Sequence, residues 1–346
     1  MGKPQRIGIL TAGGDCPGIN AAIRGVGKTA ITKYGMEVIG FSSGFSGIIN
    51  KEYEVLDEAR LSGILTLGGT ILGTSREKPF KKNGNKGTDK PDRIKKHYKE
   101  LGLDCLVCIG GNGTQKTAAL LAEEGLNVIG IPKTIDNDVY GTDFTFGFDS
   151  AVWIATEAID RLHSTANSHK RIMVIELMGH TAGWLALYAG MAGGGDVILL
   201  PELGYDLQVI NRYLLDRAYK KKPYSIVVVA EGVEKPEEEP SAAGYVAKMI
   251  EKGTRIETRT TILGYVQRGG TPSPMDRILA TRFGTKAVDL ITQEKFGRMV
   301  NIVNNTTDSI PLSEVAGKLN LVPKKHSLIN KARALDICMG DECHFS

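Results

Sequence analysis

The stretch LDCLVCIGGNGTQKTAALLAEEGLNVIGIPKT, residues 103–134, has the pattern of a strand, a helix and a second strand. An apolar run ends in glycines, a helical pattern rich in Ala, Leu and Glu follows, and a second apolar run begins after Gly125. This order predicts two parallel strands of one sheet that are joined by a helix on its face.

The same order recurs along the chain. RIGILTAGG (6–14) leads into NAAIRGVGKTAITKYG (20–35), and both KRIMVIELMGHTAG (170–183) and SIVVVAEG (225–232) are apolar runs closed by glycine. Short buried strands that alternate with helices predict an α/β fold with mostly parallel sheets covered on both faces. Ligands then bind at the carboxyl ends of the strands. The polar stretch 76–93 is rich in turn formers and is expected to be a surface loop.

The composition is that of a globular protein large enough for two domains. Of the 346 residues, 42% are hydrophobic and 24% charged, and no apolar run approaches the ~20 residues of a membrane span. The net charge of +4 is spread along the chain, which argues against nucleic acid as the main partner. An odd number of cysteines, five, and the absence of a signal-peptide pattern favour a reducing cytoplasm. The pair Cys105 and Cys108 falls in an apolar run, which favours a buried strand over a metal or redox site.

Two glycine turns are candidates for phosphate binding. GGDCPGIN (13–20) follows a strand and opens a helix, so free amide groups point at an anion, or the segment is only a tight turn. In IGGNGT (109–114), glycines leave room for the backbone to touch a phosphate chain. GVGKT (25–29) is different, because a P-loop requires Gly where Ala22 stands, and Lys28 is expected on a helix surface.

A third candidate is Lys133 with Asp136 and Asp138, in a segment that follows an apolar strand. If the segment is extended, alternate residues place both carboxylates on one side. Phosphoryl transfer needs a base for the acceptor's proton, a group that holds Mg²⁺ and a cation, and these three side chains could supply them. The alternative is a turn cluster, since Asp and Asn are common in turns.

Several cationic side chains lie close to the other glycine turns. Arg171, His180, Arg259 and Arg268, together with Tyr265, stand in or beside SHKRIMVIELMGHTAGW (168–184) and ETRTTILGYVQRGGTPSPMDR (257–277). Guanidinium groups pair bidentately with phosphate, so the set suits a phosphomonoester, although each arginine alone could be a surface charge.

Taken together, GGDCPGIN, GGNGT, PKTIDND, FGFDSA, SHKR, MGHTAGW, AEG and LGYVQRGGTPSPMDR closely resemble the 6-phosphofructokinase family, in order from about residue 6 to 305. The resemblance implies two doubly wound α/β domains with mostly parallel sheets. Residues 1–138 and about 256–305 would bind the phosphoryl donor, and 139–255 and about 306–346 would bind fructose 6-phosphate. It also implies a cytoplasmic homotetramer, sometimes a dimer, with sites shared between subunits.

The resemblance assigns roles to individual residues. Asp136 would be the base that takes the proton of the 1-hydroxyl, with Thr134, Lys133 and His180 beside the transferring phosphoryl group, and Mg²⁺ would lie at Asn112 and Asp138. The residues expected to line the donor are Gly14, Arg76, Glu77, Gly111, Asn112, Gly113 and Thr114. The residues expected to bind the sugar phosphate are Thr134, Ile135, Asp136, Arg171 (from a neighbouring subunit), Met178, Gly179, His180, Glu231, Arg259 and Tyr265 to Arg268.

This sequence departs from the family pattern at three of these positions. His180 stands where many members have an arginine, Asn112 replaces an acidic neighbour of Mg²⁺, and Tyr265 replaces a histidine. The first two departures also leave open a regulatory subunit with poor catalysis, although both Asp136 and Asp138 are present.

The prediction of the phosphoryl donor depends on two residues that favour different donors. Within the family, a glycine at position 113 accompanies ATP and an aspartate there accompanies pyrophosphate, while pyrophosphate users have a lysine where Lys133 stands. A lysine suits either donor, but a carboxylate beside ATP does not, so Gly113 favours ATP. The expected activity is therefore ATP-dependent phosphorylation of fructose 6-phosphate to fructose 1,6-bisphosphate in glycolysis, with a reversible pyrophosphate-dependent phosphotransferase as the alternative.

Overall fold

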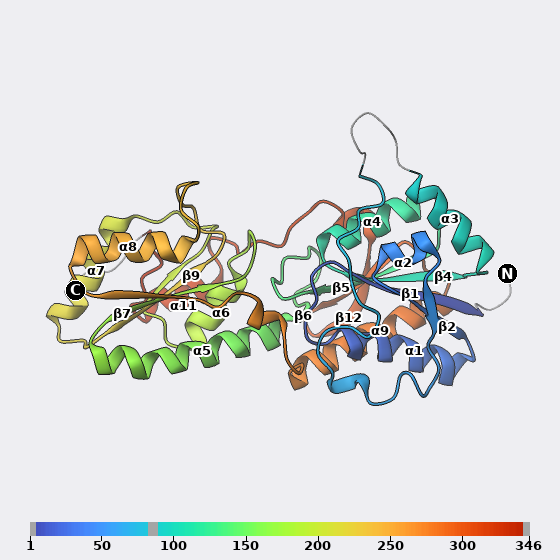
Figure 1. The fold of residues 1–346 in the computed structure, drawn as a ribbon, viewed down its shortest axis with the longest axis horizontal. Helices are drawn as coiled ribbons and strands as arrows, with labels where there is room; N and C mark the ends of the chain where they lie inside the picture. The colour runs from blue at the N-terminus through green and yellow to red at the C-terminus, as the bar shows by residue number, and fades with distance from the viewer. Residues whose placement is uncertain (1–4, 82–88, 342–346) are drawn as a thin grey trace. The chain divides into compact units, whose positions relative to one another are not determined.

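The computed structural model describes residues 5–81 and 89–341, which form two compact units (Figure 1). The first contains the described residues up to Ser150 together with Arg268–Leu319. The second contains Ala151–Gln267 and the described residues from Asn320 onward. Among the described residues, no helix combines the length and apolar character that a bilayer crossing requires.

The first unit is built on one mostly parallel sheet. Its strands are β1 (Arg6–Ala12), β2 (Glu37–Phe41), β3 (Tyr53–Val55), β4 (Cys105–Gly110), β5 (Val128–Thr134), β6 (Phe146–Gly147), β11 (Arg298–Val303) and β12 (Thr306–Pro311). They pair in the order β12-β11-β5-β4-β1-β2-β3, with β6 paired to β5. Only β2 with β3 and β11 with β12 are antiparallel, at the two edges. Strands β4 and β5 are buried along their whole length, as expected for central strands between two layers of helices.

Helices cover both faces of this sheet. They are α1 (Ile19–Tyr34), α2 (Phe45–Asn50), the 3₁₀ turn η1 (Ile64–Thr66), α3 (Lys90–Glu100), α4 (Asn112–Glu123), α9 (Pro274–Thr292) and α10 (Leu312–Val315). Figure 1 shows α1 and α9 on one side of the sheet and α2, α3 and α4 on the other. Helix α5 (Phe148–His169) starts in the first unit and continues into the second.

The second unit has a smaller sheet in which every pairing is parallel. Its strands are β7 (Ile172–Leu177), β8 (Val197–Leu199), β9 (Ser225–Ala230) and β10 (Thr258–Ile262), in the order β10-β7-β9-β8. Its other helical elements are α6 (Trp184–Ala192), α7 (Leu207–Tyr219), α8 (Ala242–Thr254), α11 (Ser327–Ala334) and the 3₁₀ turn η2 (Gly264–Arg268). The last residue of η2, Arg268, already belongs to the first unit. The α/β fold with two mostly parallel sheets is therefore confirmed.

The boundaries between the units differ from those expected from the sequence. The chain passes from one unit to the other after Ser150, Gln267 and Leu319, in place of about 138, 255 and 305. Three strand pairings account for the difference: β6 joins β5, β10 joins β7, and β12 joins β11. The partner of β10 lies far away in the sequence, whereas β12 forms a hairpin with the preceding strand β11. The short strand β6 and the polar strand β12 carry little apolar pattern of their own.

The expected surface loop at 76–93 is only partly a loop. Residues 82–88 lie outside the described part of the chain, and α3 begins at Lys90. Pro91 and Asp92 stand in the first turn of α3, where proline fits without loss of a hydrogen bond and an acid favours the helix dipole. The proline that marks a loop in a turn-rich stretch here marks a helix start.

The glycines of GVGKT serve helix packing. A Cβ atom on Gly25 of α1 would lie 3.1 Å from the Thr281 carbonyl oxygen of α9, and one on Gly27 would lie 2.5 Å from a methyl carbon of Leu61. On the facing helix, a Cβ atom on Gly284 would lie 2.7 Å from the Val26 nitrogen and 2.8 Å from the Ala22 oxygen. Helices α1 and α9 therefore meet backbone to backbone, and the segment lies inside α1, as the sequence predicts.

We expect Gly284→Ala to lower the free energy of unfolding by about 1–3 kcal/mol, because the added methyl group meets rigid backbone atoms. Chemical denaturation measures the effect. Gly204→Ala is the control, since Gly204 has no neighbour within 4 Å of an added Cβ and should change stability by less than ~0.5 kcal/mol. Equal stability of the two variants would contradict the backbone contact between α1 and α9.

Candidate active site

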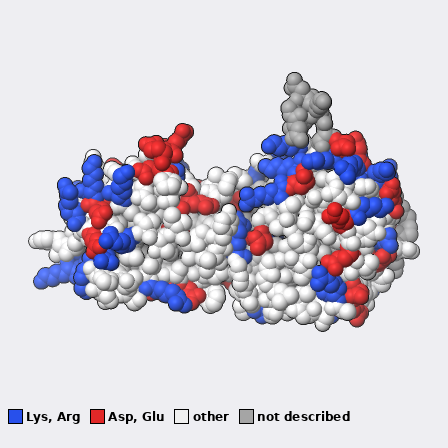
Figure 2. All heavy atoms as spheres, viewed as in Figure 1, with Lys and Arg blue, Asp and Glu red and all other residues white. Residues whose placement is uncertain are grey.

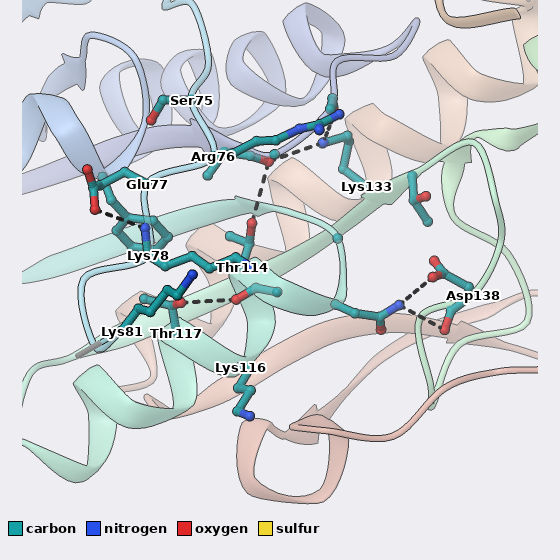
Figure 3. Close-up of a pocket in the computed structure, with 18 of the residues that line it drawn as sticks. Ser75, Arg76, Glu77, Lys78, Lys81, Thr114, Lys116, Thr117, Lys133 and Asp138 are labelled. Atoms are coloured by element: carbon teal, nitrogen blue, oxygen red, sulfur yellow. Dashed lines mark hydrogen bonds between the residues drawn. The ribbon is translucent and has the colours of Figure 1, made fainter. Parts of the chain in front are cut away.

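A pocket with a volume of about 670 Å³ lies at the carboxyl ends of β1, β4 and β5 in the first unit (Figure 3). Its walls come from the turn after β1, residues of the segment 75–81, the first turns of α4, and the segment 133–138. Each of these pieces follows the carboxyl end of a parallel strand or faces it, which is where α/β sheets bind their ligands. All seven residues predicted to line the donor belong to this pocket: Gly14, Arg76, Glu77, Gly111, Asn112, Gly113 and Thr114.

The start of α4 offers backbone N–H groups to the pocket. The helix begins at Asn112, and its N-cap Gly111 supplies no side-chain hydrogen bond. The first N–H groups of a helix have no partner within the helix and favour anions together with the helix dipole. This end of α4 is thus suited to a phosphate group.

Gly113 is a glycine that the fold does not require. A Cβ atom added there would meet no atom within 4 Å, and the backbone is outside the left-handed region where glycine is favoured. The residue is exposed to the pocket. The glycine therefore leaves open space at the pocket surface, as the donor argument from the sequence assumed.

Lys133 is the most buried charge of the site. Only 2% of the residue is exposed, and its ammonium group donates to the backbone oxygen of Ala12 over 3.2 Å and to that of Gly14. Burial lowers the pKa of Lys133, since the charged form loses its hydration. The ammonium lies at the turn after β1, so a phosphate in the pocket can restore favourable interactions to it.

The segment after β5 is a turn, whereas the sequence argument placed both carboxylates on an extended stretch. Asn137 has a φ of 51°, and its side chain accepts from the Thr145 backbone N–H over 2.9 Å and donates to the Asp143 oxygen over 3.1 Å. Asparagine tolerates this left-handed conformation better than most residues. Asp136 and Asp138 flank Asn137, and both line the pocket. The carboxylates are brought together, but by a turn and not by strand alternation.

Asn112 and Asp138 contact each other directly. The Asn112 amide nitrogen donates to an Asp138 carboxylate oxygen over 2.6 Å and to the Asp138 backbone oxygen over 3.2 Å (Figure 3). The amide oxygen of Asn112 is buried and has no hydrogen-bond partner among the residues that the structure describes. A buried oxygen of this kind beside a carboxylate suits a hard cation or its water.

These two residues fit a magnesium ion that is bound mainly by its ligand. In the described part of the chain, no group of three or more His, Cys, Asp and Glu could hold a metal. Magnesium usually takes one or two carboxylates from the protein and completes its shell with water and substrate phosphates. The residues present therefore fit Mg²⁺ that arrives with a phosphorylated donor.

Arg268 lies beside the turn after β1. Its guanidinium donates to the Asp15 oxygen over 3.3 Å, and a Cβ atom on Gly14 would lie 2.7 Å from one of its nitrogens. Gly14 thus makes room for the guanidinium. Arg268, expected from the family resemblance at the sugar phosphate, lies in the wall of the pocket that holds Lys133.

In the second unit, the loop after β7 is held by Glu231, which follows β9. The Glu231 carboxylate accepts from the backbone N–H groups of Gly179 over 3.2 Å and His180 over 2.7 Å. His180 has a φ of 53° and an exposed side chain. Met178, Gly179, His180 and Glu231, predicted to bind the sugar, are therefore brought together at the carboxyl end of this sheet.

Arg171 and Arg259 lie at the opposite end of the same sheet. Arg171 precedes β7 and Met178 follows it, so about 20 Å of strand separates them, and Arg259 is opposite Met173 in the register. Both guanidinium groups pair with Glu257, Arg171 over 2.6 Å, and these bonds lower the pKa of Glu257. Within one chain, the structure does not bring these arginines to the loop of His180.

Three further predicted residues have distinct environments. Thr134 is buried and lines the pocket, where its hydroxyl accepts from the Asp136 backbone N–H over 3.1 Å. The side chain of Ile135 is fully buried. Tyr265 is 74% exposed in η2 of the second unit.

Several residues of the pocket were not predicted from the sequence. They are Ser75, Lys78, Phe80, Lys81, Lys116 and Thr117. Lys116 carried a signal that could have been used, because it stands four residues after Asn112 and so lies on the same face of α4. Ser75, Lys78, Phe80 and Lys81 carry no such signal, because the place of this segment depends on a contact with the turn after β1, where the Gly13 N–H donates to the Ser75 oxygen.

The fold and the pocket define an α/β phosphoryl-transfer protein. A helix N-terminus and the buried Lys133 suit phosphate, and two carboxylates and a magnesium-compatible pair lie at the same sheet edge. The family model Phosphofructokinase matches residues 6–291. The chain belongs to the phosphofructokinase family.

Similar proteins agree with this assignment. The chain is 61% identical to ATP-dependent 6-phosphofructokinase 3 of Bacteroides thetaiotaomicron, over 97% of this chain and 100% of that protein. It is 57% identical to an ATP-dependent 6-phosphofructokinase of Spirochaeta thermophila (97% and 98%) and 45% identical to a pyrophosphate–fructose 6-phosphate 1-phosphotransferase of Streptomyces coelicolor (92% and 96%). The crystal structure of Pichia pastoris phosphofructokinase in the T-state has a TM-score of 0.83 at 32% identity, over 91% of this chain and 36% of that one.

Asn112→Asp tests the magnesium-compatible pair without an assay of activity. In EDTA we expect the free energy of unfolding to fall by about 1–3 kcal/mol, because a hydrogen bond to Asp138 is replaced by repulsion between two partly buried carboxylates. Added Mg²⁺ should restore the lost stability, since two carboxylates bind the cation together. Thermal unfolding with and without Mg²⁺ measures both effects.

Asn112→Ala is the matched control, because it loses the same hydrogen bond and adds no charge. Its stability should be insensitive to Mg²⁺. A magnesium effect of the same size in both variants would show that the cation binds elsewhere.

Proposed function

We propose that this protein transfers the terminal phosphoryl group of ATP to the 1-hydroxyl group of fructose 6-phosphate, giving fructose 1,6-bisphosphate in the first committed step of glycolysis. The observation that carries the choice of ATP is the open space at Gly113, which neither packing nor backbone conformation explains. The ATP-dependent relatives at 61% and 57% identity support the same choice.

In the proposed reaction, the oxygen of the sugar's 1-hydroxyl group attacks the terminal phosphorus atom of the donor, and Asp136 accepts the hydroxyl proton. Thr134 stands two residues before Asp136, and its hydroxyl accepts from the Asp136 backbone N–H, which holds the turn in place. Lys133, Arg76 and Arg268 line the same pocket and balance the negative charge of the transferring group. Asp138 and Asn112 would hold Mg²⁺, which neutralises donor phosphate charge when bound.

Sugar recognition is assigned to the second unit. Met178, Gly179, His180 and Glu231 would bind the sugar. Arg171, Arg259 and Tyr265 would bind the 6-phosphate. Because Arg171 and Arg259 lie at the other end of β7 from His180, their position supports a role in the site of a neighbouring subunit. A cytoplasmic homotetramer, or a homodimer, is part of the proposal.

The second candidate is a reversible transfer from pyrophosphate. It is favoured by the buried ammonium of Lys133 in the donor pocket and by the Streptomyces coelicolor relative at 45% identity. Initial rates with Mg²⁺ and matched ATP or pyrophosphate separate the two candidates. A larger rate with pyrophosphate would overturn the choice of ATP. The absence of turnover with both donors would overturn the proposed phosphotransferase activity.

Asp136→Asn should lower kcat for fructose 1,6-bisphosphate formation by about 10²–10⁴, because the amide has the same shape but cannot accept the proton. Affinity for ATP, measured by calorimetry, should stay within about threefold of the wild type. Asp160→Asn on the exposed face of α5 is the control for a lost charge and should leave kcat unchanged. A kcat near that of the wild type in Asp136→Asn would remove Asp136 from the role of base.

Gly113→Asp should raise the KM for ATP by at least about tenfold while the free energy of unfolding stays constant or rises slightly. The added carboxylate enters the donor space, whereas the fold has open room there and an acid favours a helix N-terminus. Gly113→Ala controls for the loss of glycine alone. Unchanged use of ATP by Gly113→Asp would show that position 113 does not select the donor.

A further inference from the structure

Three lysines form the outer part of the donor pocket and are named here the lysine rim: Lys78, Lys81 and Lys116. All three are exposed. Among the residues that the structure describes, no carboxylate lies within ion-pair distance of any of them. Figure 2 shows the Lys and Arg side chains of this face of the molecule interspersed with Asp and Glu. Such a group of exposed ammonium groups attracts anions.

The rim lies away from the reacting centre. Figure 3 shows Lys133 and Asp138 on one side of the pocket and Lys78 and Lys81 on the other, with Thr114 of α4 between them. Lys116 follows Asn112 by four residues on the same face of α4, about 6 Å further along the helix axis. A linear donor whose reacting phosphate lies at Lys133 therefore extends along α4 toward the rim.

The charges of the pocket exceed what a diphosphate needs. Lys133 and Arg268 lie at the turn after β1, where the two phosphates nearest the acceptor would bind. Arg76 and the rim add four more cations to the same pocket. The acidic side chain on this wall, Glu77, already pairs with Lys90 over 2.8 Å. The outer cations are thus available to phosphates beyond the second.

We propose that the lysine rim binds the third and further phosphates of a linear donor. The phosphate chain, and not the nucleoside, then contributes most of the affinity for the donor. This rests on the proposed function, and it extends the donors to inorganic tripolyphosphate. In that reaction the terminal P–O–P bond breaks and a bond forms between the phosphorus and the 1-oxygen of fructose 6-phosphate. The hydroxyl proton passes to Asp136, and magnesium pyrophosphate leaves in place of ADP.

The test compares the wild type with the triple variant K78Q/K81Q/K116Q. Calorimetry in Mg²⁺ gives the affinities for pyrophosphate, tripolyphosphate and ATP, and initial rates give donor use. We expect the variant to bind tripolyphosphate and ATP about tenfold more weakly, because three exposed charge pairs are lost, and to bind pyrophosphate within about twofold of the wild type. The affinity for tripolyphosphate should also depend less steeply on salt in the variant.

The control K252Q/K295Q/K325Q removes the same charge from exposed lysines elsewhere and should change none of the affinities. An equal loss of affinity for pyrophosphate and tripolyphosphate in the triple variant, or no loss for either, would overturn the proposed role of the lysine rim. A loss of affinity for ATP alone would show that the lysines bind the nucleoside, and it would also overturn the proposed role of the lysine rim. Selective loss for both triphosphates supports the rim even if no donor yields fructose 1,6-bisphosphate, an outcome that would refute the proposed function only. If wild-type enzyme uses ATP and not tripolyphosphate, the extension of the donors is wrong.

Discussion

The buried ammonium of Lys133 is the interaction on which the donor pocket depends. It ties the end of β5 to the turn after β1 through the backbone oxygens of Ala12 and Gly14. A charge withdrawn from water loses several kcal/mol of hydration, which two carbonyl groups offset only in part. An anion bound in the pocket would supply the remaining stabilisation of the Lys133 ammonium. The glycine turns matter because they let backbone approach this cation and the phosphate together.

Much of the first unit could be predicted from local pattern. Apolar runs closed by glycine gave the positions of β1, β4 and β5, and the helix starts after them followed from the same turns. The residues around Asn112 and Asp136 lie in one pocket because parallel strands end at one edge, which is a property of the fold class. Periodicity was sufficient for these features because they depend on residues close in sequence.

The remaining features depend on tertiary contacts that local periodicity does not show. The left-handed turn at Asn137 is fixed by Thr145 and Asp143, and the place of Arg268 by the turn at Gly14. The boundary after Gln267 follows from β10, whose partner β7 lies in a distant part of the chain. The boundaries after Ser150 and Leu319 follow from β6 and β12, which are too short or too polar to show an apolar pattern. No local pattern contains this information, so the sequence could name the side chains but not the turn that orients them or the unit that contains them.

The 42 glycines of the chain meet different demands, and Gly284 and Gly113 mark the two extremes. Gly284 is fixed by backbone contact between two helices, whereas Gly113 is constrained by no neighbour in the fold. A residue of the second kind can change in the course of evolution without a penalty in stability. If Gly113 selects the donor as proposed, donor preference can change by substitution at this position while the core that folds the unit stays the same.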